Sequence, residues 1–196
     1  MSDILPPLST NPTAERILRE AWELFQTKGY RGVSMDELCL RSGVTKPTLY
    51  YYFQNKEVLY VQTMLHQLRG FRAIVERDAP LAVRLHELAA AFIGHFQVSV
   101  PMMLRDMEHI NEKRYQQIVD EAFTREFLAP VVAAMDAAIA RGELRPGDGT
   151  FYAWAYLGLV NTFVGRNRVP AGSVQSVAAK LTALFLDGAR ATHNEL

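Results

Sequence analysis

The chain has 196 residues, 49% hydrophobic and 21% charged, which is the composition of an ordinary globular protein and excludes a disordered or fibrous one. Its 21 basic and 21 acidic residues cancel, so the simplest indication of nucleic-acid or membrane binding, a strongly basic net charge, is absent. A balanced total still permits a local basic patch. The single cysteine, Cys39, excludes an intramolecular disulfide framework.

Residues 1–10 contain two prolines and no hydrophobic periodicity, and we expect a flexible tail there. The same segment has neither the basic region nor the apolar run of a signal peptide. The longest uncharged runs, residues 88–104 and 149–165, are shorter than the ~20 apolar residues needed to span a bilayer. We therefore expect a cytoplasmic protein without membrane segments.

The next segment predicts three helices. Residues 12–28 carry apolar side chains at three- and four-residue spacing, and Gly29 is expected to end this first helix. Residues 34–37 form a capping box that begins a second helix, and Thr45 caps a third that runs to about residue 52. Two helices of about eight residues joined by a turn that contains Gly43 are typical of a helix-turn-helix motif.

The remaining sequence also predicts helices. A fourth helix, over residues 55–78, is about 35 Å long and can connect two separate bodies. Further helices are expected over residues 81–100, 101–110, 112–141, 150–165 and 173–193, with a kink at Pro130 in the third of these. Because no alternating run is long enough for a strand, the predicted class is all-α with about nine helices.

Residues 38–56 form a local basic strip inside the neutral chain. They contain Arg41, Lys46 and Lys56, no acidic residue, and several threonines and tyrosines. Lysines, hydroxyls and phenols on a short exposed helix suit phosphate contact and reading of base edges. The alternative interpretation is a buried aromatic end of a small helical domain.

The order of these residues resembles the TetR family of bacterial transcriptional regulators. The resemblance covers about residues 11–60 and is carried by Gly29-Tyr30, Ser34–Leu38, Ser42–Phe53 and Asn55–Leu59. It implies a helix-turn-helix DNA-binding domain over residues 11–55. It also implies a ligand-binding and dimerisation domain over residues 56–196, with the helix at residues 55–78 joining the two.

The resemblance also implies roles for single residues. The helix at residues 45–52 would lie in the major groove as the recognition helix. The side chains nearest the bases would be those of Lys46, Pro47, Thr48 and Tyr51. The phosphate contacts would be made by Thr45, Tyr50 and Lys56.

The helix predicted over residues 150–165 is apolar on all sides, and a partner chain is therefore expected to cover part of it. In the family the last two helices form a four-helix bundle across a twofold axis. The interface would then contain Phe151, Trp154, Leu157, Val177, Leu181, Leu184 and Phe185. The alternative is a single large core within one chain.

Aromatic and methionine side chains of the middle segment indicate an adaptable apolar pocket, although plain core packing is the better explanation of any single one of them. As a whole, the pocket is implied by the resemblance and would take a small hydrophobic effector. Its candidate residues are Phe71, Phe92, Phe96, Met103, Met107, His109, Tyr115 and Phe123.

The sequence offers little support for an enzyme. The histidines have no metal-ligand spacing, and neither a phosphate-binding glycine loop nor a nucleophile elbow is present. We expect no cofactor and no metal. The favoured hypothesis is a dimeric, ligand-released repressor of a palindromic DNA operator. The alternatives are an activator of the same family, or a helical ligand-binding protein or enzyme without DNA function.

Overall fold

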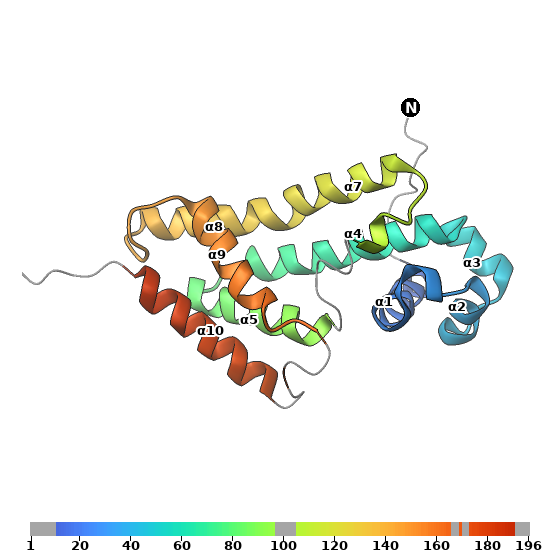
Figure 1. The fold of residues 1–196 in the computed structure, drawn as a ribbon, viewed down its shortest axis with the longest axis horizontal. Helices are drawn as coiled ribbons and strands as arrows, with labels where there is room; N and C mark the ends of the chain where they lie inside the picture. The colour runs from blue at the N-terminus through green and yellow to red at the C-terminus, as the bar shows by residue number, and fades with distance from the viewer. Residues whose placement is uncertain (1–10, 97–104, 166–168, 170–172, 191–196) are drawn as a thin grey trace, which may run out of the picture. The chain divides into compact units, whose positions relative to one another are not determined.

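The computed structural model describes residues 11–96, 105–165, 169 and 173–190. These residues form nine α-helices and one π-helical segment and contain no β-strand, so the predicted all-α class is confirmed (Figure 1). Within the described ranges, no helix is long and apolar enough to cross a bilayer. The predicted tail, residues 1–10, lies outside these ranges.

The chain divides into two compact units, which we call the head and the body. The head comprises the described residues of Met1–Leu68 and Pro101–Ala122, and the body those of Arg69–Val100 and Phe123–Leu196. This division differs from the domain boundary expected at residue 55, because the first half of the fourth helix is part of the head. Side chains there, among them Val58, Leu59 and Val61, are fully buried.

Four helices of the head follow the predicted order. They are α1 (Pro12–Gly32), α2 (Met35–Ser42), α3 (Lys46–Phe53) and the start of α4 (Lys56–Val75). Gly29 interrupts α1 at φ 69°, and Gly43 ends α2 in the left-handed conformation at φ 62°. Both positions favour glycine because it has no Cβ to clash with the backbone at positive φ.

Side-chain caps start the helices of the head, and the cap at Ser34 is the one that the capping box predicts. The Ser34 hydroxyl accepts a hydrogen bond from the Glu37 backbone N–H at 3.1 Å, and the Asn55 side chain accepts one from the Val58 N–H at 2.9 Å. Leu38, Leu49 and Phe53 form the buried interior of the helix-turn-helix. These caps and contacts set where α2, α3 and α4 begin and which face of α3 stays outside.

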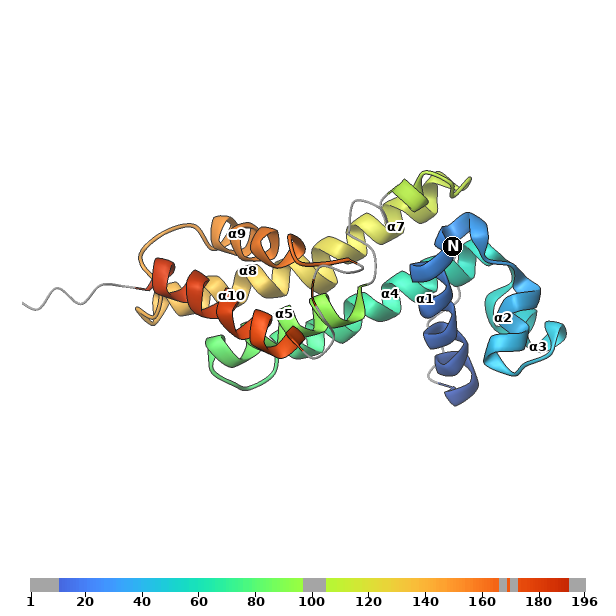
Figure 2. The same cartoon turned by 60° about the horizontal axis from the view of Figure 1, so that its bottom comes forward.

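The body contains α5 (Leu81–His95), α8 (Ala129–Ala140), α9 (Gly149–Asn161) and α10 (Val174–Ala189). Figures 1 and 2 both show α10 running alongside α5, and these two helices pack together. The helices expected over residues 81–100 and 173–193 end before their predicted last residues, α5 at His95 and α10 at Ala189. Their last predicted residues, 97–100 and 191–193, lie outside the described ranges.

The long helix predicted over residues 112–141 is divided into α7 (Lys113–Phe123), the π-helical segment η1 (Thr124–Leu128) and α8. Pro130 stands at the start of α8 and has no N–H to donate to the carbonyl four residues earlier. The backbone N–H of Ala129 donates instead to the carbonyl of Thr124, five residues back. The irregularity thus precedes the proline as a π-bulge.

A buried tyrosine connects three helices of the body. The Tyr156 hydroxyl on α9 donates to the Leu85 carbonyl on α5 at 2.6 Å and lies 2.9 Å from the Thr182 hydroxyl on α10. Burial, opposed by the bond to Thr182, raises the pKa of Tyr156 well above its usual value. The phenol therefore stays neutral and acts as a fixed hydrogen-bonding group.

Tyr156→Phe is expected to lower the free energy of unfolding of the body by about 1–3 kcal/mol, because buried groups lose a partner. Tyr152→Phe removes an exposed hydroxyl whose bond to the Arg145 carbonyl is 3.4 Å long, and is the matched control. Urea unfolding followed by Trp154 fluorescence in a Trp22→Phe background measures both, because the chain has two tryptophans. Equal losses in the two variants would contradict the role of Tyr156.

Candidate nucleic-acid interface

The N-terminus of α3 is built from two threonine side chains. The Thr45 hydroxyl accepts a hydrogen bond from the Thr48 backbone N–H at 3.4 Å, and the two hydroxyl oxygens lie 2.9 Å apart. Pro47 stands in the first turn, where its missing N–H leaves no intrahelical bond unmade. The cap therefore fixes the start of α3 and presents a pair of hydroxyls there.

The apolar and aromatic side chains of α3 are divided between a buried and an exposed face of the helix. Leu49 and Phe53 are buried in the head, whereas Tyr50 is 46% exposed and Tyr51 is 80% exposed. The Tyr52 ring lies edge-on to that of Tyr51, with centroids 5.1 Å apart. Since an exposed tyrosine leaves apolar area in water, Tyr50 and Tyr51 form a surface suited to a partner.

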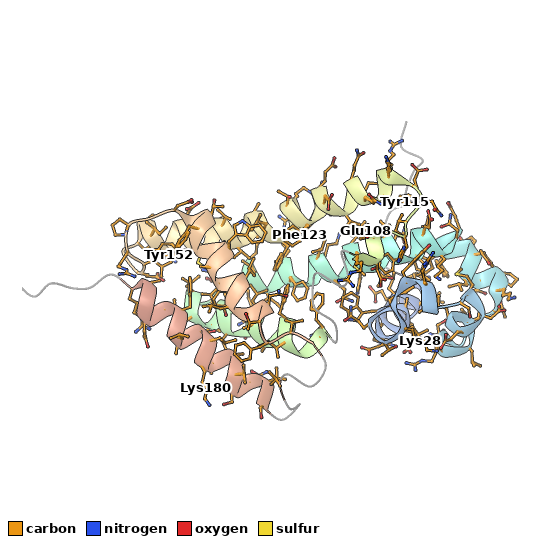
Figure 3. All side chains as sticks on the ribbon, in the orientation of Figure 1. Lys28, Glu108, Tyr115, Phe123, Tyr152 and Lys180 are labelled. Carbon is orange, nitrogen blue, oxygen red and sulfur yellow. The ribbon has the colours of Figure 1, made fainter. Side chains whose placement is uncertain are left out.

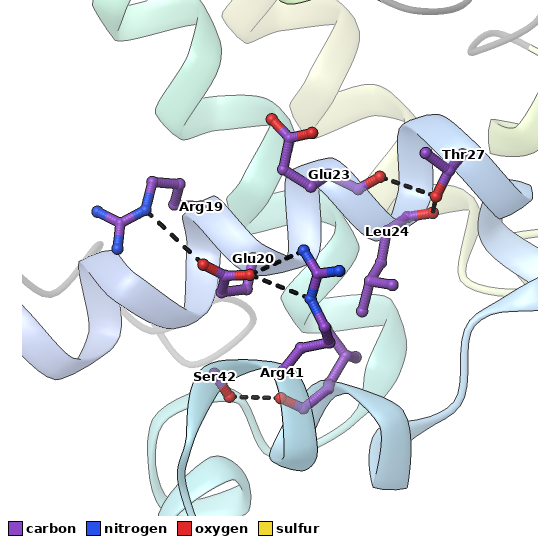
Figure 4. Close-up of polar contacts among 8 residues, drawn as sticks. Arg19, Glu20, Glu23, Leu24, Thr27, Arg41 and Ser42 are labelled. Carbon is purple, nitrogen blue, oxygen red and sulfur yellow. Dashed lines mark hydrogen bonds and ion pairs between the residues drawn. The ribbon is translucent and has the colours of Figure 1, made fainter.

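Each basic residue of the strip at residues 38–56 has a partner elsewhere in the head. The Arg41 guanidinium on α2 binds Glu20 on α1 at 3.1 Å (Figure 4). Lys46 pairs with Asp36 at 2.6 Å. The hydrogen bond to the Asp36 carboxylate, and then its charge, raise the pKa of Lys46.

The third basic residue, Lys56, lies at the first turn of α4. Its Nζ sits 4.5 Å from the centre of the Tyr30 ring, in cation–π geometry. Partial burial lowers the pKa of Lys56, and the nearby Asp106 carboxylate opposes this shift. Sequence reasoning missed Asp106, because it lies fifty residues from Lys56 and has no local pattern around it.

All residues assigned to DNA contact lie in the head. The side chains of Thr45, Lys46, Pro47, Tyr50 and Tyr51 are exposed, and those of Thr48 and Lys56 are half-buried. The exposed positions lie along α3 and at its N-terminus. The assignment of base and phosphate contacts to these side chains stays a prediction.

The candidate effector residues are distributed over both units. Phe71, Phe92 and Phe96 pack in the body with Phe127, and their ring centroids are 4.7 to 5.7 Å apart. Phe123, which is labelled in Figure 3, contacts Phe127 at 5.4 Å between ring centroids. The other candidates are not in this cluster: the head contains Met107, His109 and Tyr115, and Met103 lies outside the described residues.

The residues assigned to the dimer interface differ in exposure. Phe151, Trp154 and Leu184 are 67%, 50% and 64% exposed, and Val177 is half-buried. Leu157, Leu181 and Phe185 are buried within the chain itself, and the Phe185 ring packs edge-on against Tyr156. These three side chains already pack in the chain's own core, and their assignment to a dimer interface stays a prediction.

The comparisons with known proteins agree with this architecture. Residues 17–63 match the family model of bacterial regulatory proteins of the tetR family. The HTH-type transcriptional regulator YvaF of Bacillus subtilis, itself uncharacterized, is 28% identical over 153 residues, which are 75% of this chain and 78% of that one.

Solved structures share the fold. The TetR-family regulator PfmR of Thermus thermophilus has a TM-score of 0.67 at 24% identity, covering 88% of this chain and 97% of that one. AibR, solved in complex with isovaleryl coenzyme A and operator DNA, has a TM-score of 0.59 at 20% identity, covering 87% and 96%.

The helix-turn-helix head and the family match define a DNA-binding transcriptional regulator rather than an enzyme. Over residues 17–63 the chain is similar to the tetR family of bacterial regulatory proteins, and its described residues share the fold of a solved TetR-family regulator.

Tyr51→Ala is expected to weaken binding to the promoter upstream of the chain's own gene by at least about ten-fold, because an exposed contact of α3 is lost. At 80% exposure Tyr51 contributes little to the core, so the midpoint of thermal unfolding should not change. Fluorescence anisotropy measures the affinity, and Tyr51→Phe separates the hydroxyl from the ring. Unchanged affinity for both variants would remove Tyr51 from the interface.

Proposed function

We propose that the protein is a homodimeric repressor that binds a roughly palindromic operator and is released from it by a small apolar effector. The observation that carries the proposal is the exposed face of α3, with its hydroxyl pair at Thr45 and Thr48 and the exposed Tyr50 and Tyr51. Hydroxyls and phenols at a helix of this size match the contacts of a recognition helix in a major groove.

Exposed apolar side chains on the last two helices support the dimer. Phe151 and Trp154 on α9 and Leu184 on α10 are each at least half exposed, in a body whose other large apolar side chains are mostly buried. Large apolar side chains grouped on two adjacent helices mark interaction surfaces more often than solvated ones. A second copy of the chain would cover them and form the four-helix bundle that the family resemblance implies.

A dimer dictates the symmetry of its DNA site. Two recognition helices related by a twofold axis enter successive major grooves, about 34 Å apart or a multiple of that distance. The operator therefore consists of two inverted half-sites with fixed spacing. A protein of this kind acts on the chromosome, which is consistent with a cytoplasmic location.

The aromatic cluster of the body supports an apolar effector. Phe71, Phe92, Phe96 and Phe127 are all less than 9% exposed and are packed ring against ring. An effector that inserts an apolar group among these rings would separate them and move the helices that carry them. AibR shares the fold and was solved with both an acyl coenzyme A and operator DNA, so one such fold can hold both ligands.

Release is then a population shift between two arrangements of the dimer. An effector releases DNA only if it binds the arrangement that does not fit the operator more tightly than the one that does. A ~100-fold preference between the two arrangements corresponds to ~2.7 kcal/mol. That free energy is within reach of a ligand that buries a few apolar carbons.

Footprinting on the promoter upstream of the chain's own gene tests the operator. We expect protection of two inverted half-sites, and Thr48→Ala should weaken protection of both equally, because each protomer contributes one α3. Transcription from the same promoter should fall when the protein is added. A single protected half-site would contradict the palindromic operator, and a rise in transcription would identify an activator.

Sedimentation velocity at micromolar concentration tests the dimer. Leu184→Glu should yield a monomer, because a carboxylate would be desolvated at the interface without a partner. Val83→Glu places the same charge at an exposed aliphatic position of α5 and should leave a dimer. A wild-type monomer, or two variants that sediment alike, would contradict the proposed interface.

A further inference from the structure

The first residue of α3 forms an ion pair with the first turn of α2. Lys46 Nζ lies 2.6 Å from Asp36 Oδ1, and the two side chains are 59% and 69% exposed. The Thr45 hydroxyl caps α3 directly before Lys46, and the Ser34 hydroxyl caps α2 two residues before Asp36. The capped helix ends therefore hold the backbone on both sides of the pair, while its side chains stay accessible to a partner.

The turn between α2 and α3 keeps the two charged residues together. The Val44 backbone N–H donates to the Cys39 carbonyl at 3.1 Å, which closes the chain on itself directly after α2. The two helices also pack against each other. Because the turn and the packing fix α3 relative to α2, Asp36 and Lys46 stay neighbours in the folded head.

A second acid in the first turn of α2 has a different partner. Glu37 pairs with Lys28 on α1, a lysine outside the basic strip at residues 38–56. Either carboxylate suits the positive end of the α2 dipole, so helix stabilisation does not distinguish the two acids. What distinguishes Asp36 is that its partner is the first residue of the helix proposed to read DNA.

We propose that Asp36 is a positioning residue that keeps Lys46 off the DNA phosphates and leaves it available to a base edge. The inference rests on the proposed function, in which Lys46 lies near the bases. An ammonium has three donors, so Lys46 can keep its bond to Asp36 and still donate to other acceptors. Asp36 then determines which kind of acceptor is favourable.

The charge of the second acceptor makes the difference. Two oxygens bound to one ammonium lie roughly 4.5 Å apart, because its donors point to the corners of a tetrahedron. A phosphate oxygen at that distance from the Asp36 carboxylate is repelled, which lowers its affinity about five-fold at the dielectric constant of water. Guanine O6 and N7 carry no net charge and are not repelled in this way. The ion pair therefore disfavours phosphate contact by Lys46 without disfavouring base contact.

Asp36→Asn tests the proposal, because an asparagine oxygen can still accept a hydrogen bond from Lys46 while the charge is gone. Two duplexes are compared, one from the promoter upstream of the chain's own gene and one with the same bases in shuffled order. With screening by salt, the dimer should bind the shuffled duplex about five-fold more tightly. Its slope of log K against log salt should steepen by about 0.9 per protomer, because each Lys46 gains a phosphate.

Affinity for the promoter duplex should change much less, so the ratio of the two affinities should fall. Fluorescence anisotropy over a salt series measures affinities and slopes for the full-length chain. The midpoint of thermal unfolding should stay the same, because an exposed ion pair contributes little to stability.

Two matched variants make the test specific. Glu37→Gln removes the same charge one residue away and should change the shuffled-duplex affinity and slope much less. In a Lys46→Gln background, Asp36→Asn should bring no more gain than Glu37→Gln does. Equal effects of the two single variants, an unchanged affinity ratio, or a full gain without Lys46 would overturn the proposal while leaving the proposed function intact. A wild-type chain that binds the promoter and shuffled duplexes alike would overturn both.

Discussion

The head depends on the left-handed turn at Gly29. The turn ends the regular part of α1 and places Tyr30 where its ring meets Phe25, Tyr60 and the Lys56 ammonium, while its N–H meets Asp106. Any other residue at this position would combine an unfavourable φ with a Cβ close to the Asp106 carboxylate. One backbone conformation thus determines the position of α1, the first turn of α4 and the segment at residues 105–111 relative to one another.

The basic residues near the DNA-binding helices are not free charges, just as the net charge of the whole chain is zero. Arg41, Lys46 and Lys56 each have an acidic or aromatic partner inside the head, so binding to DNA exchanges one partner for another. Exposed ion pairs of this kind are worth little, so such an exchange costs little free energy. Non-specific affinity is therefore expected to be modest, and discrimination between sequences falls to the hydroxyls and phenols of α3.

The body has a tightly packed aromatic interior and, on its surface, several exposed large apolar side chains. Four phenylalanine rings are packed against one another, and Tyr156 supplies hydrogen bonds between α5, α9 and α10. Phe151, Trp154 and Leu184 remain outside this interior. An apolar effector would act on the packed rings and a second copy of the chain on the exposed residues, so the two interactions use different side chains of the same unit.

The sequence alone determined the all-α class and the caps at Ser34 and Thr45, because capping and helical spacing act within a few residues. The role of α3 as the recognition helix is implied by the family resemblance and stays a prediction. Only the tertiary structure decided the partners of Lys46 and Lys56 and the burial of Leu181 and Phe185 within the chain. These features depend on residues far apart in the chain or on which face of a helix the core covers, and hydrophobic periodicity does not say which neighbour a face will meet.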